Sequence, residues 1–152
     1  MSPASEVWFY HLERRRIGDV LPDLLEKTLK RGWRALVRAQ DPDLLRALDE
    51  ALWTFRADAV LPHGRAEEPF AEDQPILLTG DCANVNGAQA LFILGDAAQD
   101  GFREYSRCVV LFEDADLPAR EAARSLLRTL RSEGGAAAYW RETERGFDKR
   151  AL

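Results

Sequence analysis

The sequence predicts a three-layer α/β/α fold, with helices on both faces of a mixed, mostly parallel sheet. Short apolar runs rich in β-branched and aromatic residues alternate along the chain with amphipathic segments of helical period. Hydrophobic residues make up 46% of the 152 residues and charged residues 31%, which is typical of a globular protein. Since no repeat or linker divides the chain, we expect a single domain over residues 1–152, with right-handed crossovers between parallel strands.

The first half of the chain contains two predicted strand–helix pairs. The aromatic run at 6–12 predicts the first strand, and Asp19 is the expected N-cap of a helix that ends near Gly32. A second strand at 33–39 precedes Asp41, which together with the following proline is typical of a helix start. The expected apolar sides of the two helices are Leu21, Leu24, Leu25, Thr28 and Leu29, and Leu44, Leu45, Leu48, Ala51 and Leu52. Each helix therefore has one face to pack against a sheet.

The second half adds four predicted strands and one helix. The strands are the runs at 75–80, 89–95, 108–114 and 136–143. The helix begins at Asp116 and ends at Gly134. Its apolar side is Ala119, Ala122, Ala123, Leu126, Leu127 and Leu130. Because 136–143 alternates apolar and polar residues, we expect an edge strand there; the ordered core would span about residues 5–143, and 144–152 would be a flexible tail.

Charge and hydropathy exclude several classes of protein. A net charge of −5 disfavours nonspecific attraction to DNA or RNA, whose affinity comes largely from neutralised phosphates. No apolar run approaches the roughly 20 residues that span a bilayer, and the first residues lack the features of a signal peptide, so we expect a cytoplasmic protein. Cys82 and Cys108 are far apart in the chain, and we expect both to be buried, reduced thiols outside any metal site.

Patterns of known catalytic chemistry are missing. A Rossmann-like sheet that binds a dinucleotide needs closely spaced glycines after its first strand, but residues 12–19 (LERRRIGD) hold one glycine and three consecutive arginines. His11 and His63 are the only histidines, and neither lies in a recognisable catalytic or metal-binding context. The sequence therefore predicts no catalytic residue, metal or cofactor. This absence disfavours the alternative of a nucleotide-dependent or hydrolytic enzyme.

One charged pattern does point to a ligand. Arg120, Arg124, Arg128 and Arg131 follow one another at i, i+4, i+8 and i+11, which places four guanidinium groups on one side of the last helix. A solvated helix face is the simplest explanation of such a stripe. Uncompensated positive charge in an acidic protein also suits an acidic peptide or a free carboxyl terminus, which arginine binds through two hydrogen bonds.

Three segments resemble one known family in their order and separation. They are LPDLLEKTLKRGWRALVRA (21–39), LDEALWTFRADAVLPHG (48–64) and AEDQPILLT (71–79), and they resemble the chi subunit of bacterial DNA polymerase III. The similarity runs from the first strand to 139–140, nearly the whole chain. The block at 48–64 is the most specific part, because α/β folding by itself does not require it.

The resemblance implies a Rossmann-like adaptor in the clamp-loader complex, an accessory subunit of a DNA-directed DNA polymerase with no catalysis of its own. Members of the family pair with the psi subunit and bind the acidic C-terminal tail of single-stranded DNA-binding protein. DNA would then be approached only through another protein, in keeping with the net negative charge. Direct binding of single-stranded nucleic acid through arginines and exposed aromatic residues is a third class of function, which we expect to be absent.

The resemblance also implies where the tail binds. Arg120 and Arg128 match basic positions of the family, and Arg124 matches the arginine most identified with gripping the tail. Leu127 stands where some members have tyrosine, so the pocket for the terminal phenylalanine of the tail is expected to differ in shape.

The block at 48–64 corresponds to the surface that faces psi in this family. The residues assigned to it are Trp53, Phe55, Val60, Leu61, Pro62 and His63. Val60 stands where well-known members have phenylalanine, and Phe55 is an aromatic residue that they lack at this site. In some relatives the same surface binds a helicase related to the iron–sulfur repair helicases, so psi and such a helicase are alternative partners.

Overall fold

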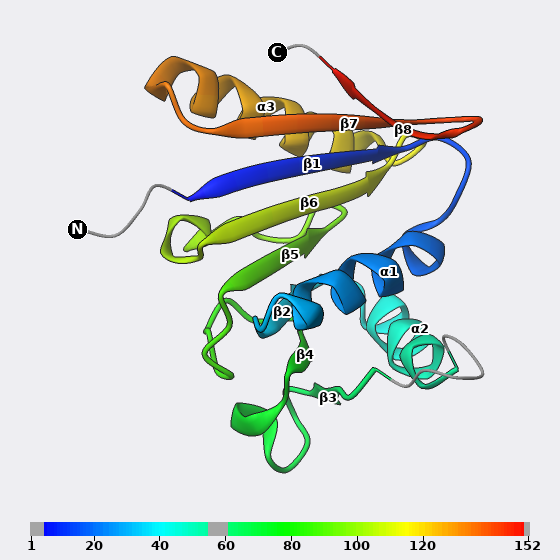
Figure 1. Cartoon of the computed structure of the whole chain (residues 1–152), viewed down its shortest axis with the longest axis vertical. Helices are drawn as coiled ribbons and strands as arrows, with labels where there is room; N and C mark the ends of the chain where they lie inside the picture. The colour runs from blue at the N-terminus through cyan, green and yellow to red at the C-terminus, as the bar shows by residue number, and fades with distance from the viewer. Residues whose placement is uncertain (1–4, 55–60, 151–152) are drawn as a thin grey trace.

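The computed structural model describes residues 5–54 and 61–150, which form an eight-stranded sheet and three α-helices (Figure 1). In chain order the elements are β1 (Glu6–Leu12), α1 (Ile17–Lys30), β2 (Ala35–Arg38), α2 (Pro42–Trp53), β3 (Gly64–Arg65), β4 (Ile76–Thr79), β5 (Ala90–Leu94), β6 (Arg107–Glu113), α3 (Leu117–Glu133), β7 (Ala137–Thr143) and β8 (Gly146–Arg150). The strand order is β3-β4-β2-β5-β6-β1-β7-β8. Every neighbouring pair is parallel except β7 and β8, so the mixed, mostly parallel sheet is confirmed.

Helices cover both faces of the sheet, as the sequence predicts. Figure 1 shows α1 and α2 on one face and α3 on the other. Alternate strand residues supply the two cores, because successive side chains of a strand point to opposite faces. Tyr10 and Val37 belong to the cluster that packs with α1 and α2, whereas Phe9 and Leu36 belong to the cluster that packs with α3. Within the described ranges, no helix combines the length and apolarity that crossing a bilayer requires.

The start of α1 differs from the prediction. The helix begins at Ile17 with Arg16 at the N-cap, and Asp19 lies inside its first turn. The Asp19 carboxylate still serves the helix start, because it accepts a hydrogen bond of 3.0 Å from the Arg16 backbone N–H. A second carboxylate, that of Glu113 on β6, accepts the Ile17 N–H at 3.1 Å. The prediction that Asp19 is the N-cap was wrong. The helix starts earlier, after Arg16, because the carboxylate of Glu113 on β6 also accepts a backbone N–H of its first turn.

The carboxyl end also differs from the prediction. Residues Gly146–Arg150 form β8, which pairs antiparallel with β7, so β7 is not an edge strand and the expected flexible tail is wrong for these residues. Gly146 has a φ of 132° in the turn, a conformation that favours glycine. Phe147 then places its ring 5.1 Å from that of Tyr10, edge to face. One partly buried aromatic side chain thus anchors a strand that is otherwise polar.

The other helix termini are as predicted. Asp41 caps α2 by accepting the Asp43 N–H at 2.9 Å, and Asp116 caps α3 by accepting the Ala119 N–H at 3.2 Å. Gly134 ends α3 in the left-handed conformation, with a φ of 69°. These caps fix the start of α3 at the carboxyl end of β6, where the candidate site lies.

Candidate functional site

A cavity of about 220 Å³ opens between α3 and the strands β1, β6 and β7. The side chains that line it are His11, Phe112, Arg120, Arg124, Leu127, Tyr139 and Arg141. Residues three and four apart on a helix share one side, so Arg120, Arg124 and Leu127 reach the same cavity from successive turns of α3. The α3 pocket, as we call it, is therefore a small hollow of mixed polar and apolar lining with three guanidinium groups around it.

His11 forms the floor of the α3 pocket. Its Nδ1 lies 2.7 Å from the Tyr139 hydroxyl and its Nε2 lies 2.7 Å from Asp114 Oδ1, and the ring stacks on Phe112 with 4.7 Å between centroids. The hydrogen bond with His11 holds the pKa of the Asp114 carboxyl below its usual range, and nearby Arg120 acts in the same direction. Burial raises the pKa of Tyr139. A buried, hydrogen-bonded network thus fixes the rings against which a ligand would pack.

The three arginines of the α3 pocket are not equivalent. Arg120 Nε lies 3.7 Å from Asp114 Oδ1, and Arg141 forms an ion pair with Glu13 whose hydrogen bond lowers the pKa of that carboxyl. Arg124 makes no ion pair or hydrogen bond through its side chain with any residue in 5–54 or 61–150. Arg124 is therefore the cation of this pocket whose charge is available to an anionic ligand.

The same region contains a group of side chains with metal-ligand chemistry. Ligand atoms of His11, Glu13 and Asp114 lie within 4.8 Å of one another. Both carboxylates already contact arginines, since Glu13 pairs with Arg141 and Asp114 lies beside Arg120. The guanidinium groups of Arg120 and Arg141 beside these carboxylates repel a further cation. The arrangement therefore favours an anion in the pocket over a metal ion beside it.

Two arginines of the stripe lie outside the lining of the α3 pocket. Arg128 is exposed and its Nη2 lies 3.5 Å from Glu121 Oε1, while Arg131 is exposed on the last turn of α3. The structure thus brings Arg120, Arg124 and Leu127 together and leaves Arg128 on the adjoining helix surface.

Sequence reasoning missed the strand residues of the pocket. Tyr139 and Arg141 lie on β7, directly beside His11 on β1, because β1 and β7 are parallel neighbours in which His11 is opposite Arg141. His11 and Arg141 lie in the carboxyl-terminal halves of their strands, the end at which ligands bind in open parallel sheets. That rule identifies them only after the strand order is known, since β1 and β7 are the first and seventh strands of the chain.

The second predicted surface is only partly exposed. Trp53 is 53% exposed at the end of α2, and Pro62 is exposed. Leu61 and His63 are buried at 3% and 5% exposure, so both support the surface and neither lines it. Two further members of the set, Phe55 and Val60, lie outside the described residues.

His63 links α2 to the residues just before β3. Its Nδ1 lies 2.7 Å from the Leu61 carbonyl oxygen, and its Nε2 lies 2.8 Å from Asp49 Oδ1. The ring packs against Trp53 with 4.2 Å between centroids. The His63 ring thus supports the indole of Trp53 by packing against it. This structural role accounts for a histidine at position 63 and requires no acid–base chemistry.

Comparison with known sequences assigns the chain to a family. The sequence model of the family described as "DNA polymerase III chi subunit, HolC" matches residues 4–138. The chain belongs to the DNA polymerase III chi subunit family. The matched range contains every α3 residue of the α3 pocket and ends just before Tyr139.

One curated relative carries the same name. The chain is 27% identical over 85 residues to the "Probable DNA polymerase III subunit chi" of Rickettsia prowazekii (strain Madrid E). The match covers 56% of this chain and 52% of the relative, so the chain spans about half the length of that protein.

Proposed function

We propose that this chi-family chain is a non-catalytic adaptor of the DNA polymerase III clamp-loader complex, and that its α3 pocket binds the acidic C-terminal tail of single-stranded DNA-binding protein. Arg124, a cation without an ion-pair partner in the described residues, is the observation that carries the proposal. Its guanidinium would hold the terminal carboxylate, and the hollow between Leu127 and Tyr139 would take the last side chain of the tail.

The first prediction concerns Arg124. Replacing Arg124 by alanine should weaken binding of a synthetic acidic tail peptide about tenfold or more, because a hydrogen bond to a charged group contributes roughly 1.5–3 kcal/mol. Isothermal titration calorimetry measures the affinity directly. Arg131→Ala is the matched control, since Arg131 is an exposed arginine of the same helix outside the pocket lining. Equal affinities of Arg124→Ala and the unaltered chain would refute the proposal.

The second part of the proposal is that the surface around Trp53 and Pro62 binds the psi subunit. What supports it is a half-exposed indole held rigidly by His63, since aromatic side chains packed on a firm base are typical anchors of protein interfaces. A repair helicase that uses the same surface is the alternative partner.

The second prediction concerns Trp53. Replacing Trp53 by alanine should weaken binding of purified psi by about 2 kcal/mol, roughly thirtyfold, as truncation of an interface anchor does. Tail binding at the α3 pocket should stay unchanged, which controls for folding. Phe70→Ala removes another exposed ring, 70% accessible, and should leave psi binding intact. Competition between psi and a purified helicase of this class would show whether they share the surface; undiminished psi binding by Trp53→Ala would count against the assignment.

A further inference from the structure

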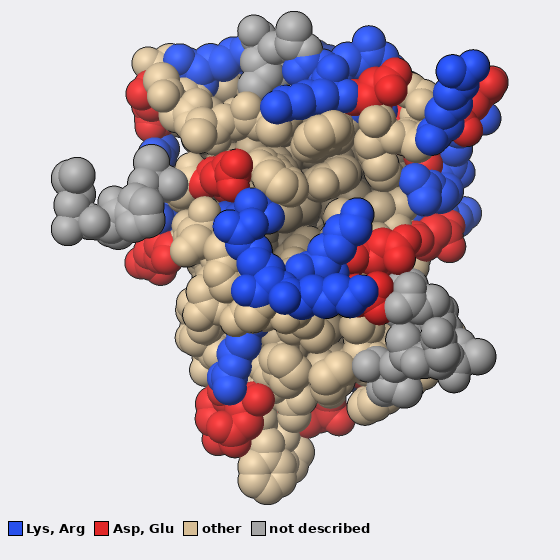
Figure 2. Space-filling model, viewed as in Figure 1, with Lys and Arg blue, Asp and Glu red and all other residues tan. Residues whose placement is uncertain are grey.

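The face of the sheet that carries α1 and α2 is only partly covered by them. In Figure 1 the two helices lie over the β5, β2 and β4 side of the sheet, and β6, β1 and β7 extend beyond them. Three aromatic residues, Trp8 on β1, Trp140 on β7 and Phe147 on the adjoining β8, are partly buried and pack against the core cluster under α1. Figure 2 shows Lys and Arg side chains gathered around a hollow in the middle of this face.

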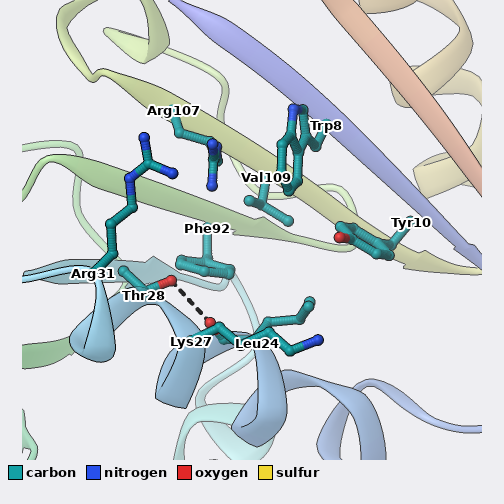
Figure 3. Close-up of a pocket in the computed structure, with 9 residues that line it drawn as sticks. All are labelled: Trp8, Tyr10, Leu24, Lys27, Thr28, Arg31, Phe92, Arg107 and Val109. Carbon is teal, nitrogen blue, oxygen red and sulfur yellow. Dashed lines mark hydrogen bonds between the residues drawn. The ribbon is translucent and has the colours of Figure 1, made fainter. Parts of the chain in front are cut away.

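A cavity of about 290 Å³ lies in this hollow, between α1 and the strands β1, β5 and β6 (Figure 3). Its apolar lining includes Tyr10, Leu24, Phe92 and Val109. The first three come from three different elements and point toward one another in Figure 3. A cavity of this size has room for a single bulky apolar group.

Cations surround the mouth of this cavity. Arg107 is held by Glu6, with Nη2 3.0 Å from Oε2, and its guanidinium lies 3.8 Å from the ring of Trp8. Lys27, on the last turn of α1, and Arg31, the residue that caps its carboxyl end, make no ion pair with any residue in the described ranges. The positive charge at the end of α1 is therefore uncompensated beside an apolar cavity.

A second cavity of about 360 Å³ continues the first along α1. The two share Tyr10, Leu24 and Lys27, and the second extends to Trp140 and Phe147. At its far end Arg15 lies with its guanidinium 5.4 Å from the Phe147 ring. We call the two cavities together the α1 groove. It follows a helix of 14 residues, about 21 Å long, which an extended peptide of roughly seven residues would span.

We propose that the α1 groove binds an acidic polypeptide segment of a protein partner, which inserts a bulky apolar side chain into each cavity and places carboxylates against Lys27 and Arg31. Charge complementarity carries the choice of occupant. Of the four cations along the groove, Arg107 and Arg15 are paired with Glu6 and Glu142, whereas Lys27 and Arg31 have no ion pair in the described residues, and the carboxylate in the lining is Asp23. The groove lies on the face opposite the α3 pocket, so this inference does not rest on the proposed function.

Single-stranded nucleic acid fits the groove less well than an acidic peptide. Bases bind such surfaces by stacking on open ring faces. Here the ring faces are already covered: Arg107 lies over Trp8, Arg31 lies 4.2 Å from the ring of Trp33, and Tyr10 stacks against Trp140. The open volume is instead in the two cavities, which take side chains inserted end-on.

Titration by NMR tests the proposal. The probe is an acetylated and amidated peptide with two phenylalanines at positions i and i+2, which face the same side of an extended chain, among aspartates and glutamates. Its blocked end lacks the carboxylate expected in the α3 pocket. Adding it to the full chain labelled with nitrogen-15 should shift the indole N–H signals of Trp8 and Trp140. The variants Arg31→Glu and Lys27→Glu should each weaken binding at least fivefold.

Matched controls separate the groove from general electrostatics. Lys30→Glu reverses a charge on the same last turn of α1 outside both cavities, and Arg124→Ala removes the free cation of the α3 pocket, so both should keep the affinity of the unaltered chain. The same peptide with alanines in place of the phenylalanines should bind at least tenfold more weakly. Equal binding by Arg31→Glu, equal binding of the alanine peptide, or a preference for an oligothymidylate over the acidic peptide would overturn the proposal.

Discussion

At the scale of single residues, buried charges connect the segments of this chain that lie far apart in sequence. Glu142 on β7 is 2% exposed and accepts hydrogen bonds from the backbone N–H groups of Glu13, Arg14 and Arg15. The Arg15 side chain adds an ion pair of 2.6 Å. Burial opposes ionisation of Glu142, but these hydrogen bonds outweigh it and lower its pKa to about 2. One carboxylate thereby fixes the turn between β1 and α1 onto β7.

The shifted pKa of Glu142 predicts a pH dependence of stability. Because the folded-state pKa lies below the unfolded one, the stabilisation is fully present above about pH 4.5 and is lost as the pH falls toward 2. The shift corresponds to a contribution on the order of 3 kcal/mol at neutral pH. Glu142→Gln should lower the free energy of urea unfolding by about this amount at pH 7 and flatten its decline between pH 4.5 and 2. Glu144→Gln, at an exposed ion pair, should change stability little; a similar loss in both variants would contradict the role assigned to Glu142.

At the scale of elements, the sequence predicts what depends on local periodicity and misses what depends on neighbours. The helices α2 and α3 are predicted with their caps because Asp41 and Asp116 act on residues two or three positions away. The start of α1 is not predicted correctly, since the Glu113 carboxylate that accepts its first N–H lies 96 residues further along the chain. β8 is missed because its polar sequence forms a strand only through pairing with β7 and the contact between Phe147 and Tyr10.

The residues of the candidate site are likewise predicted only where they depend on local periodicity. Helical spacing places Arg120, Arg124 and Leu127 on one side of α3, and the structure brings these three into one pocket. The same spacing extends to Arg128, which points away to Glu121. Four of the seven lining residues come from β1, β6 and β7, whose adjacency follows from strand order, and no periodicity in the sequence encodes that order. The spacing of charged residues therefore predicts which of them share a face of the helix. Predicting the pocket also requires the order of the strands in the sheet.

At the scale of the whole molecule, a chain with a net charge of −5 carries two cation-rimmed hollows on opposite faces of one sheet. The two are separated by the sheet and by the packed layer under each helix, on the order of 20 Å in total. Sites on opposite faces can be occupied at the same time, which is what the proposed adaptor role requires.

The separation predicts how two acidic ligands affect each other. At 0.15 M salt the screening length is about 8 Å, so a tail peptide in the α3 pocket and the blocked acidic peptide in the α1 groove should change each other's affinity by less than about twofold. At 0.01 M salt screening extends to about 30 Å, and each peptide should weaken the other, by the same factor in both directions because the coupling is reciprocal. Titration of each peptide with and without saturation by the other measures this coupling. Tenfold mutual weakening at 0.15 M salt would instead mean that the peptides compete for one site, since repulsion through the sheet is too weak at that salt concentration to produce it.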